Sequence, residues 1–232
     1  MAYPQFHLPN QSMQANTYSQ QNIVHPQAKF QIYQLEKQNL VQIQPSFSEL
    51  PVTPYADGQY RLRRYSRVYW YPDHLIESKQ HDFMQNKTYN KFQGDVKRHF
   101  EGITHEVLTG ACLKRLCDIF IRANQLGEGQ EIEVHQMRIK TLGQQTPVAP
   151  EGIHQDGFDC IALIGIQRNN IFGGCVQVFE DKSQAAVYSQ ILADGAVVVL
   201  DDHHYWHYAT PIVRQDAQRD GFMDVMVLTA NR

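Results

Sequence analysis

Cysteine is scarce in this sequence, and long apolar runs are missing. The 232 residues contain four cysteines, at positions 112, 117, 160 and 175, and none of them forms a Cys-x-x-Cys pair. So few, scattered cysteines argue against a disulfide scaffold and predict reduced, mostly buried thiols. No segment approaches the roughly 18 to 20 apolar residues of a membrane span, and the N-terminus lacks a basic region followed by an apolar run. We therefore expect a cytoplasmic protein without a membrane partner.

An excess of positive charge is also missing. The formal net charge is -3 at pH 7, which argues against nucleic acid and anionic membrane surfaces as partners. Hydrophobic residues make up 42% and charged residues 19% of the chain, an ordinary balance for a globular protein. A chain of this length can form one domain with a sizeable core. Nothing in the pattern indicates an oligomeric state.

The first 30 residues carry a single charged side chain, Lys29, and are rich in Gln, Asn, Ser and Pro without a sustained period. This composition predicts a loose polar extension in front of one domain that spans residues 31–232.

The remainder of the chain has one clear helical pattern and several strand patterns. Apolar residues recur at three- and four-residue steps over 104–126, where Thr104 can cap a helix and Gly127 can end it. Short segments rich in β-branched and aromatic residues predict strands at 131–140, 159–167, 175–181, 195–200, 206–213 and 222–229. No helix-length gap separates these strands, so the pattern favours antiparallel pairing in a sandwich or barrel.

A basic and aromatic strip lies upstream, in the run YRLRRYSRVYW from Tyr60. As a strand it would present Arg61, Arg63, Tyr65 and Arg67 on one face. Such a face could bind phosphates, but a solvated strand face is the commoner explanation.

Two short motifs together predict a metal site. His154 and Asp156 are two residues apart, so in an extended segment both project to the same side and can hold one ion. A third ligand is offered by His207, which opens a predicted strand 51 residues after Asp156, whereas His203 and His204 fall in the preceding turn. Two histidines and one carboxylate form the facial triad typical of non-haem Fe(II) oxygenases.

The blocks around these motifs resemble a known family. They are PEGIHQDGFDCIALIGIQRNNIFGGCVQVFED, from Pro150, and GAVVVLDDHHYWHYATPI, from Gly195. Both are similar to the bacterial 2-oxoglutarate/Fe(II)-dependent dioxygenases that hydroxylate free L-amino acids such as L-isoleucine, and the similarity covers about residues 60–232. The order of PEGIHxDG, Asn-x-x-Gly-Gly and His-x-x-Thr-Pro makes the resemblance specific.

The resemblance implies a mainly β fold with supporting helices, a double-stranded β-helix of the jelly-roll, cupin-like kind. It implies that His154, Asp156 and His207 bind Fe(II) and act in catalysis, with 2-oxoglutarate as cosubstrate and dioxygen as oxidant. The implied reaction hydroxylates a C–H bond of a small free L-amino acid, aliphatic or sulfur-containing, and releases succinate and CO2.

One position departs from the family pattern. An arginine usually binds the far carboxylate of 2-oxoglutarate at the start of the last strand, where this chain has Met223. A thioether cannot make the two parallel hydrogen bonds that arginine offers a carboxylate. The candidate replacements are Arg219, Arg214 and Arg138; Arg138 shares a strand face with Ile132, Val134 and Gln136 and could point into the barrel.

The substrate pocket has less specific candidates. Arg63 or Arg64 could bind an amino acid carboxylate, and Tyr65, Trp206 and Phe158 could line the pocket, although aromatic residues in a β protein often serve only the core. Two other functions stay open: a hydroxylase of another substrate class, or a non-catalytic metal-binding or regulatory barrel in which Met223 has removed cosubstrate binding.

Overall fold

A computed structural model describes residues 30–79, 82–143 and 145–232 of the chain. Their largest element is a seven-stranded sheet in which every neighbouring pair is antiparallel. In sheet order its strands are β1 (Phe30–Gln34), β11 (Ala196–Asp201), β7 (Cys160–Asn169), β14 (Phe222–Ala230), β6 (Gln130–Lys140), β2 (Arg61–Trp70) and β3 (Leu75–Glu77).

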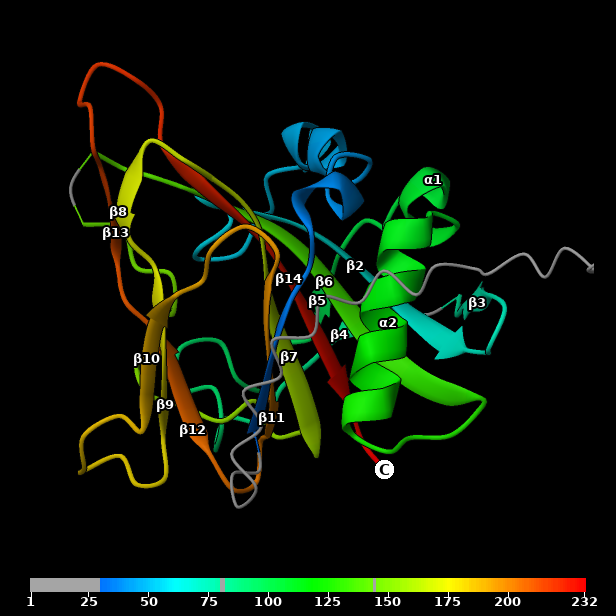
Figure 1. Cartoon of the computed structure of the whole chain (residues 1–232). Helices are drawn as coiled ribbons and strands as arrows, with labels where there is room; N and C mark the ends of the chain where they lie inside the picture. The colour runs from blue at the N-terminus through cyan, green and yellow to red at the C-terminus, as the bar shows by residue number, and fades with distance from the viewer. Residues whose placement is uncertain (1–29, 80–81, 144) are drawn as a thin grey trace, which may run out of the picture.

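Smaller sheets complete the barrel. Figure 1 shows the smaller sheet β10-β9-β12 across from the large sheet, with β8 and β13 continuing beyond it. These strands are β10 (Tyr188–Ile191), β9 (Cys175–Phe179), β12 (Trp206–Ala209), β8 (Ile171–Gly173) and β13 (Ile212–Arg214), and a separate pair is β4 (Asp82–Phe83) with β5 (Arg98–His99). From β7 to β14 the chain passes back and forth between the two antiparallel layers, as in a jelly roll. This confirms the predicted fold class.

The predicted helix over 104–126 is interrupted. The structure has two helices, α1 (His105–Leu108) and α2 (Ala111–Ala123), besides the short 3-10 helices η1 (Lys37–Asn39) and η2 (Gln44–Glu49). Gly110 between them is extended, with ψ at 142°, and a Cβ there would lie 2.9 Å from the carbonyl oxygen of Glu106. The apolar period continues across this break, so it could not reveal the change of direction.

The longer helix covers one face of the large sheet. Leu113, Leu116 and Phe120 of α2 are buried in the same cluster as Val134 and Leu228, which lie on β6 and β14. Burying large apolar side chains of this kind contributes about 1.5 to 3 kcal/mol each. Because α2 occupies this face (Figure 1), the opposite face of the sheet is the one that looks into the barrel.

Most of the predicted strands are present, with ends shifted by at most two residues. The segment 206–213 is the exception, because it divides into β12, which pairs with β9, and β13, which pairs with β8. Pro211 lies at the division and has no N–H to donate to a sheet. Strand β1 was not predicted, and the polar extension expected over residues 1–30 lies outside the described residues except for Phe30.

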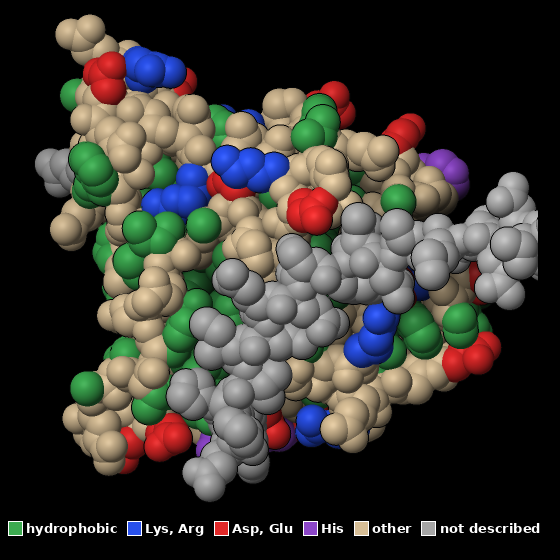
Figure 2. Space-filling model, in the orientation of Figure 1, with side chains coloured by type: hydrophobic (Ala, Val, Ile, Leu, Met, Phe, Trp, Pro, Cys, Tyr) green, Lys and Arg blue, Asp and Glu red, His purple; other side chains and the backbone are tan. Residues whose placement is uncertain are grey.

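Charged side chains of both signs are interspersed on the face shown in Figure 2, without a broad basic field. Within the described ranges, no helix is long and apolar enough to cross a membrane.

Candidate metal centre and active site

A cavity lies between the large sheet and the sheet β10-β9-β12. The open space inside it and at its mouth amounts to about 890 Å³. Alternate residues of the large-sheet strands line it, among them Met223, Val225, Val227 and Thr229 of β14. His154, Asp156 and His207 line the same cavity.

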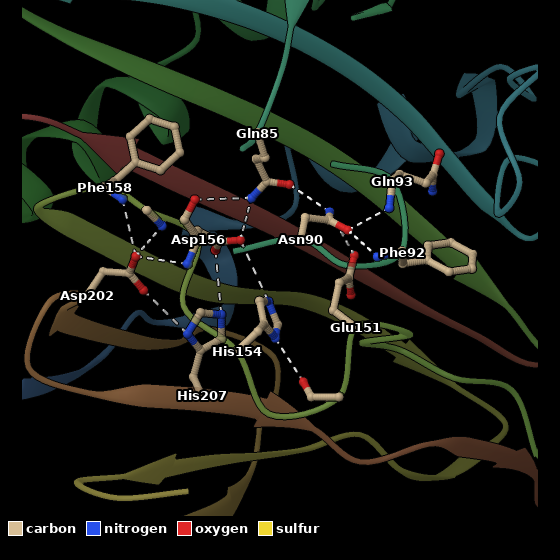
Figure 3. A network of polar contacts seen from close by, with 12 residues as sticks. Gln85, Asn90, Phe92, Gln93, Glu151, His154, Asp156, Phe158, Asp202 and His207 are labelled. Carbon is tan, nitrogen blue, oxygen red and sulfur yellow. Dashed lines mark hydrogen bonds and ion pairs between the residues drawn. The ribbon is translucent and has the colours of Figure 1, made fainter. Parts of the chain in front are cut away.

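These three residues form one compact group (Figure 3). Nε2 of His154 lies 3.6 Å from Oδ1 of Asp156, and Nε2 of His207 lies 3.5 Å from Oδ2 of Asp156. One potential ligand atom from each residue lies within 4.8 Å of the others. Two imidazoles and one carboxylate at this spacing fit a divalent first-row metal and leave coordination positions open.

The backbone holds the two histidines in register. His154 and His207 form an isolated antiparallel bridge, in which the His154 N–H donates to His207 at 3.0 Å and the His207 N–H donates to His154 at 2.8 Å. Their rings therefore meet, with centroids 4.3 Å apart. This bridge joins the segment after β6 to β12, which brings together residues about 50 positions apart in sequence.

The contacts of Nδ1 in each histidine determine that Nε2 is the nitrogen available to bind a metal. Nδ1 of His154 donates to the carbonyl of Gly152 at 2.8 Å, so its Nε2 keeps a free electron pair facing Asp156. Nδ1 of His207 lies 3.6 Å from Oδ1 of Asp202. The hydrogen bond of His154 fixes its ring orientation and raises the basicity of a metal-binding imidazole. The Asp202–His207 contact is longer than a hydrogen bond and acts through charge.

Asp202 and Gln85 support Asp156 (Figure 3). Oδ2 of Asp202 accepts the backbone N–H groups of Asp156, Gly157 and Phe158 at 2.8, 2.8 and 3.2 Å. Gln85 donates its amide to Oδ1 of Asp156 at 2.8 Å. Neither contact was predicted. Asp202 follows a strand next to the histidine-rich turn, and nothing in its sequence context indicated a contact 46 residues upstream.

The orientation of Gln85 follows from its other partners. Its Oε1 accepts from Nδ2 of Asn90 at 2.9 Å and from Nη2 of Arg98 at 3.3 Å. Because both partners are donors, the amide nitrogen of Gln85 must face Asp156. The carboxylate is thereby held in one rotamer before any ion arrives.

The electrostatics of the group favour a cation. Burial raises the pKa of Asp156, but the contact with His207 and the charges of both imidazoles outweigh it and hold that pKa well below its usual range. Burial and the neighbouring His207 lower the pKa of His154. Burial, together with the nearby Asp156 charge, raises the pKa of Asp202 to about 6. An ionised carboxylate beside a neutral imidazole is the form that metals bind.

Only some of the residues expected in the substrate pocket line the cavity. Arg63 and Phe158 line the cavity. Tyr65 is fully buried behind it, 4.8 Å from the ring of His135, which does line the cavity. Arg64 lies on the opposite face of β2, where Nη1 is 2.9 Å from Oε2 of Glu101.

Trp206 and the turn histidines also lie apart from the metal group. Trp206 is not among the residues that line the cavity, and its ring is covered by Nζ of Lys182 at 3.4 Å. His203 is exposed and contacts Oδ1 of Asp159 at 2.7 Å through its Nε2, and His204 is exposed as well. Of the histidines in this stretch, the structure brings only His207 to the cavity.

The three arginines expected to bind the cosubstrate do not line the cavity. Arg138 does share a face with Ile132 and Val134, but that face packs toward α2, and Arg138 pairs there with the buried Asp224 through two hydrogen bonds of 2.7 Å. Arg214 donates to Oγ1 of Thr141 at 2.9 Å, and Arg219 is exposed in the turn before β14. The strand period gave the right set of neighbours for Arg138 and could not tell which face looks inward.

Other cavity residues were missed by sequence reasoning. The cavity wall includes Arg61, Arg98, His135 and Glu151. Arg61 pairs with Asp57 at 2.8 Å and lies 3.6 Å from Glu151. The basic strip on β2 therefore turns inward at Arg61 and Arg63, which an alternating pattern alone could not distinguish from a solvated face.

A jelly-roll barrel with two histidines and a carboxylate in its cavity defines the class of non-haem iron oxygenases. A family model described as 2OG-Fe dioxygenase matches residues 44–229, and the chain belongs to that family. It is therefore a non-haem iron dioxygenase that uses Fe(II) and 2-oxoglutarate, and its His-Asp-His group fits the metal.

One curated relative and two solved structures are similar to this chain over most of their length. An L-isoleucine-4-hydroxylase from Bacillus thuringiensis is 22% identical over 212 residues, which cover 86% of this chain and 87% of the relative. The crystal structure of a bsmA homolog from Methylobium petroleophilum PM1 matches with a TM-score of 0.75 and 27% identity, covering 89% of each chain. IDO from Bacillus thuringiensis matches with a TM-score of 0.68 and 19% identity, covering 85% of this chain and 92% of that one, which supports the fold.

Proposed function

We propose that this dioxygenase hydroxylates a small free L-amino acid, aliphatic or sulfur-containing, with Fe(II) held by His154, Asp156 and His207. The main support is the joint geometry of the cavity, which has the His-Asp-His group and the buried cation of Arg63 on its walls. When bound, the metal with 2-oxoglutarate and dioxygen supplies the oxidising power for C–H hydroxylation, with release of succinate and CO2. The four cysteines are free thiols, which supports a reducing compartment such as the cytoplasm.

The residues around the metal group have clear tasks in this reaction. His154 and His207 present Nε2 atoms whose orientation their Nδ1 contacts support, and Gln85 holds the Asp156 carboxylate. The apolar part of the wall, including Leu163, Val176, Val225 and Val227, excludes water and fits an aliphatic side chain. The protein thus orients the substrate and keeps competing water away.

Arg63 is the proposed partner of the substrate carboxylate. Among the described residues, no carboxylate oxygen lies within ion-pair distance of its guanidinium, whose nearest aromatic contact is Phe100, at 5.1 Å from the ring centroid. Burial, with the nearby charge of Arg61, lowers the pKa of Arg63 to about 9, so the side chain stays charged at neutral pH. Glu151 lines the same cavity and offers a carboxylate to the substrate ammonium group.

The L-isoleucine-4-hydroxylase among the relatives supports an amino acid substrate. The test is to incubate the full chain with Fe(II), ascorbate and 2-oxoglutarate and to screen the twenty L-amino acids for succinate. We expect succinate with one or a few aliphatic or sulfur-containing amino acids, together with a product one oxygen atom heavier.

Two outcomes would contradict this proposal in different ways. If 2-oxoglutarate raises the melting temperature of the metal-loaded protein but no amino acid drives succinate release, the enzyme acts on another substrate class. If neither the melting temperature nor calorimetry shows binding of 2-oxoglutarate, the protein is better explained as a non-catalytic barrel.

Replacing Arg63 with methionine is expected to raise KM for the amino acid by about 10- to 100-fold, because a charged hydrogen bond of about 1.5 to 3 kcal/mol is lost. Metal affinity should not change. The matched control is Arg64→Met, on the other face of β2, which should leave KM within about twofold. Equal KM changes in the two variants would argue against Arg63 as the carboxylate partner.

Metal binding is expected to weaken as the pH falls below about 6. Burial lowers the pKa of His207, but its contact with Asp156 and the charge of that carboxylate outweigh burial and raise it. A proton on His207 therefore competes with the metal for Nε2, and the affinity falls by up to about tenfold per pH unit for each proton taken up. Calorimetric titration with Mn(II) at about pH 7.5 and about pH 5 measures this; equal affinities would contradict a two-histidine site.

A further inference from the structure

The neighbour of Met223 in the large sheet is an arginine. In the pairing of β14 with β7, Met223 lies opposite Arg168. Met223 lines the cavity, so a side chain on the same face of the neighbouring strand is well placed to reach it.

A β-bulge turns Arg168 toward that face. Val225 pairs with Gly165 and Asp224 with Gln167, so Ile166 is an extra residue in β7. Before the bulge, Ala162 and Ile164 lie in the core beneath α2, and an unbroken period would place residue 168 with them. The extra residue reverses this phase, and Arg168 instead contacts residues of the cavity side.

Among the described residues, the Arg168 guanidinium has no carboxylate partner. Nη2 of Arg168 donates to the carbonyl of Gly173 at 2.6 Å, and Nη1 lies 3.8 Å from Sδ of Met223. No carboxylate of the described residues lies within ion-pair distance of it, and the side chain is only partly exposed. A thioether is a weak acceptor, so a carboxylate would bind this cation more strongly.

The Asn-x-x-Gly-Gly motif makes room for this pair. A Cβ at Gly174 would lie 2.8 Å from Nη1 of Arg168 and 2.9 Å from Sδ of Met223. Gly174 also has φ of +67°, which favours glycine. The second glycine of the motif therefore keeps open the space in which the guanidinium and the thioether meet.

We propose that Arg168 binds the far carboxylate of 2-oxoglutarate in place of the arginine that Met223 has replaced. Arg168 is not itself among the residues that line the cavity, because Met223, which lines it, lies against Nη1. The Met223 side chain is flexible, so its rotation opens the guanidinium to the ligand. Among the other arginines, Arg61 pairs with Asp57, Arg138 pairs with Asp224, and Arg98 donates to Oε1 of Gln85. The inference depends on the cosubstrate of the family and is independent of the proposed amino acid substrate.

The test compares two ligands by calorimetry on the full chain loaded with Mn(II), without dioxygen. One ligand is 2-oxoglutarate, and the other is pyruvate, a 2-oxo acid without the far carboxylate. Arg168→Met should raise the Kd of 2-oxoglutarate about 10- to 100-fold and leave the Kd values of pyruvate and Mn(II) within about twofold. Gln167→Met, one residue away on the other face of β7, should leave all three values within about twofold.

Different results would overturn the proposal. An unchanged Kd of 2-oxoglutarate in Arg168→Met, or an equal loss for pyruvate, would show that Arg168 does not bind the far carboxylate. Failure of the wild-type protein to bind 2-oxoglutarate would refute cosubstrate use itself.

If Arg168→Met does not fold, Arg168→Lys decides, since it keeps the charge but not the paired donors. Arg168→Lys should raise the Kd of 2-oxoglutarate about threefold to tenfold and leave the Kd of pyruvate unchanged. A Kd of 2-oxoglutarate equal to that of the wild-type protein, or an equal change for both ligands, would again contradict the assignment. A double variant that combines R168M with M223R should recover 2-oxoglutarate binding.

Discussion

Replacing His207 with alanine is expected to abolish turnover and to weaken Mn(II) binding by more than about 100-fold. Loss of a residue that only supports a ligand already costs about 10- to 100-fold in metal affinity, and His207 would be a ligand itself. Its Nε2 lies 3.5 Å from Asp156, and its ring is almost fully buried. Calorimetry with Mn(II) and a succinate assay with Fe(II) measure the two effects.

The control for this experiment lies in the neighbouring turn. His203→Ala removes an exposed imidazole whose partner is Asp159, and it should leave metal affinity within about twofold. A His203 variant that loses the metal while the His207 variant keeps it would reverse the assignment of the third ligand.

Replacing Asp202 with asparagine is expected to lower Mn(II) affinity by about 10- to 100-fold. The Asp202 carboxylate accepts three consecutive backbone N–H groups, beginning at Asp156, and faces Nδ1 of His207 with its other oxygen. The neutral amide keeps the size of the side chain but weakens the hydrogen bonds that set the direction of Asp156 and removes the negative charge that faces the ring of His207. Turnover should fall in parallel.

Asp201 supplies the matched control for Asp202. Its Oδ1 accepts the backbone N–H groups of His203 and His204 at 3.1 Å, so it shapes the adjacent turn and not the metal group. Asp201→Asn should bind Mn(II) within about twofold of the wild-type protein. Wild-type affinity in Asp202→Asn would mean that the loop carrying Asp156 keeps its shape without this carboxylate.

Local periodicity was sufficient to predict most of the longer strands and to place His154 and Asp156 together, but it missed β1 and the division between β12 and β13. His154 and Asp156 are two residues apart, and side-chain alternation alone put them on one side. The meeting of His154 with His207 is a backbone bridge between distant segments, and its prediction relied on the family resemblance as well as strand phase. Agreement between local pattern and global fold is what made this part of the molecule predictable.

Features that depend on which face looks inward were not predictable. Arg138 was grouped with the right neighbours, but α2 covers that face, and the helix position follows from tertiary packing. Arg168 was overlooked because the bulge at Ile166 reverses the strand period, and a single sequence carries no mark of such an extra residue.

Contacts between distant loops were likewise hidden. Gln85 reaches Asp156 across 71 positions, and its amide orientation depends on Asn90 and Arg98. In the sequence alone, nothing distinguishes these three residues from ordinary polar surface residues. The support around a metal site is therefore found from coordinates, even when the site itself can be proposed from a motif.

The most direct test of the central claim is an anomalous-scattering map from crystals of the full chain grown with Mn(II) and 2-oxoglutarate in the absence of dioxygen. The account predicts one strong peak between Nε2 of His154, the carboxylate of Asp156 and Nε2 of His207. A peak at other residues, or no peak at this group under conditions where calorimetry shows saturation with Mn(II), would contradict it.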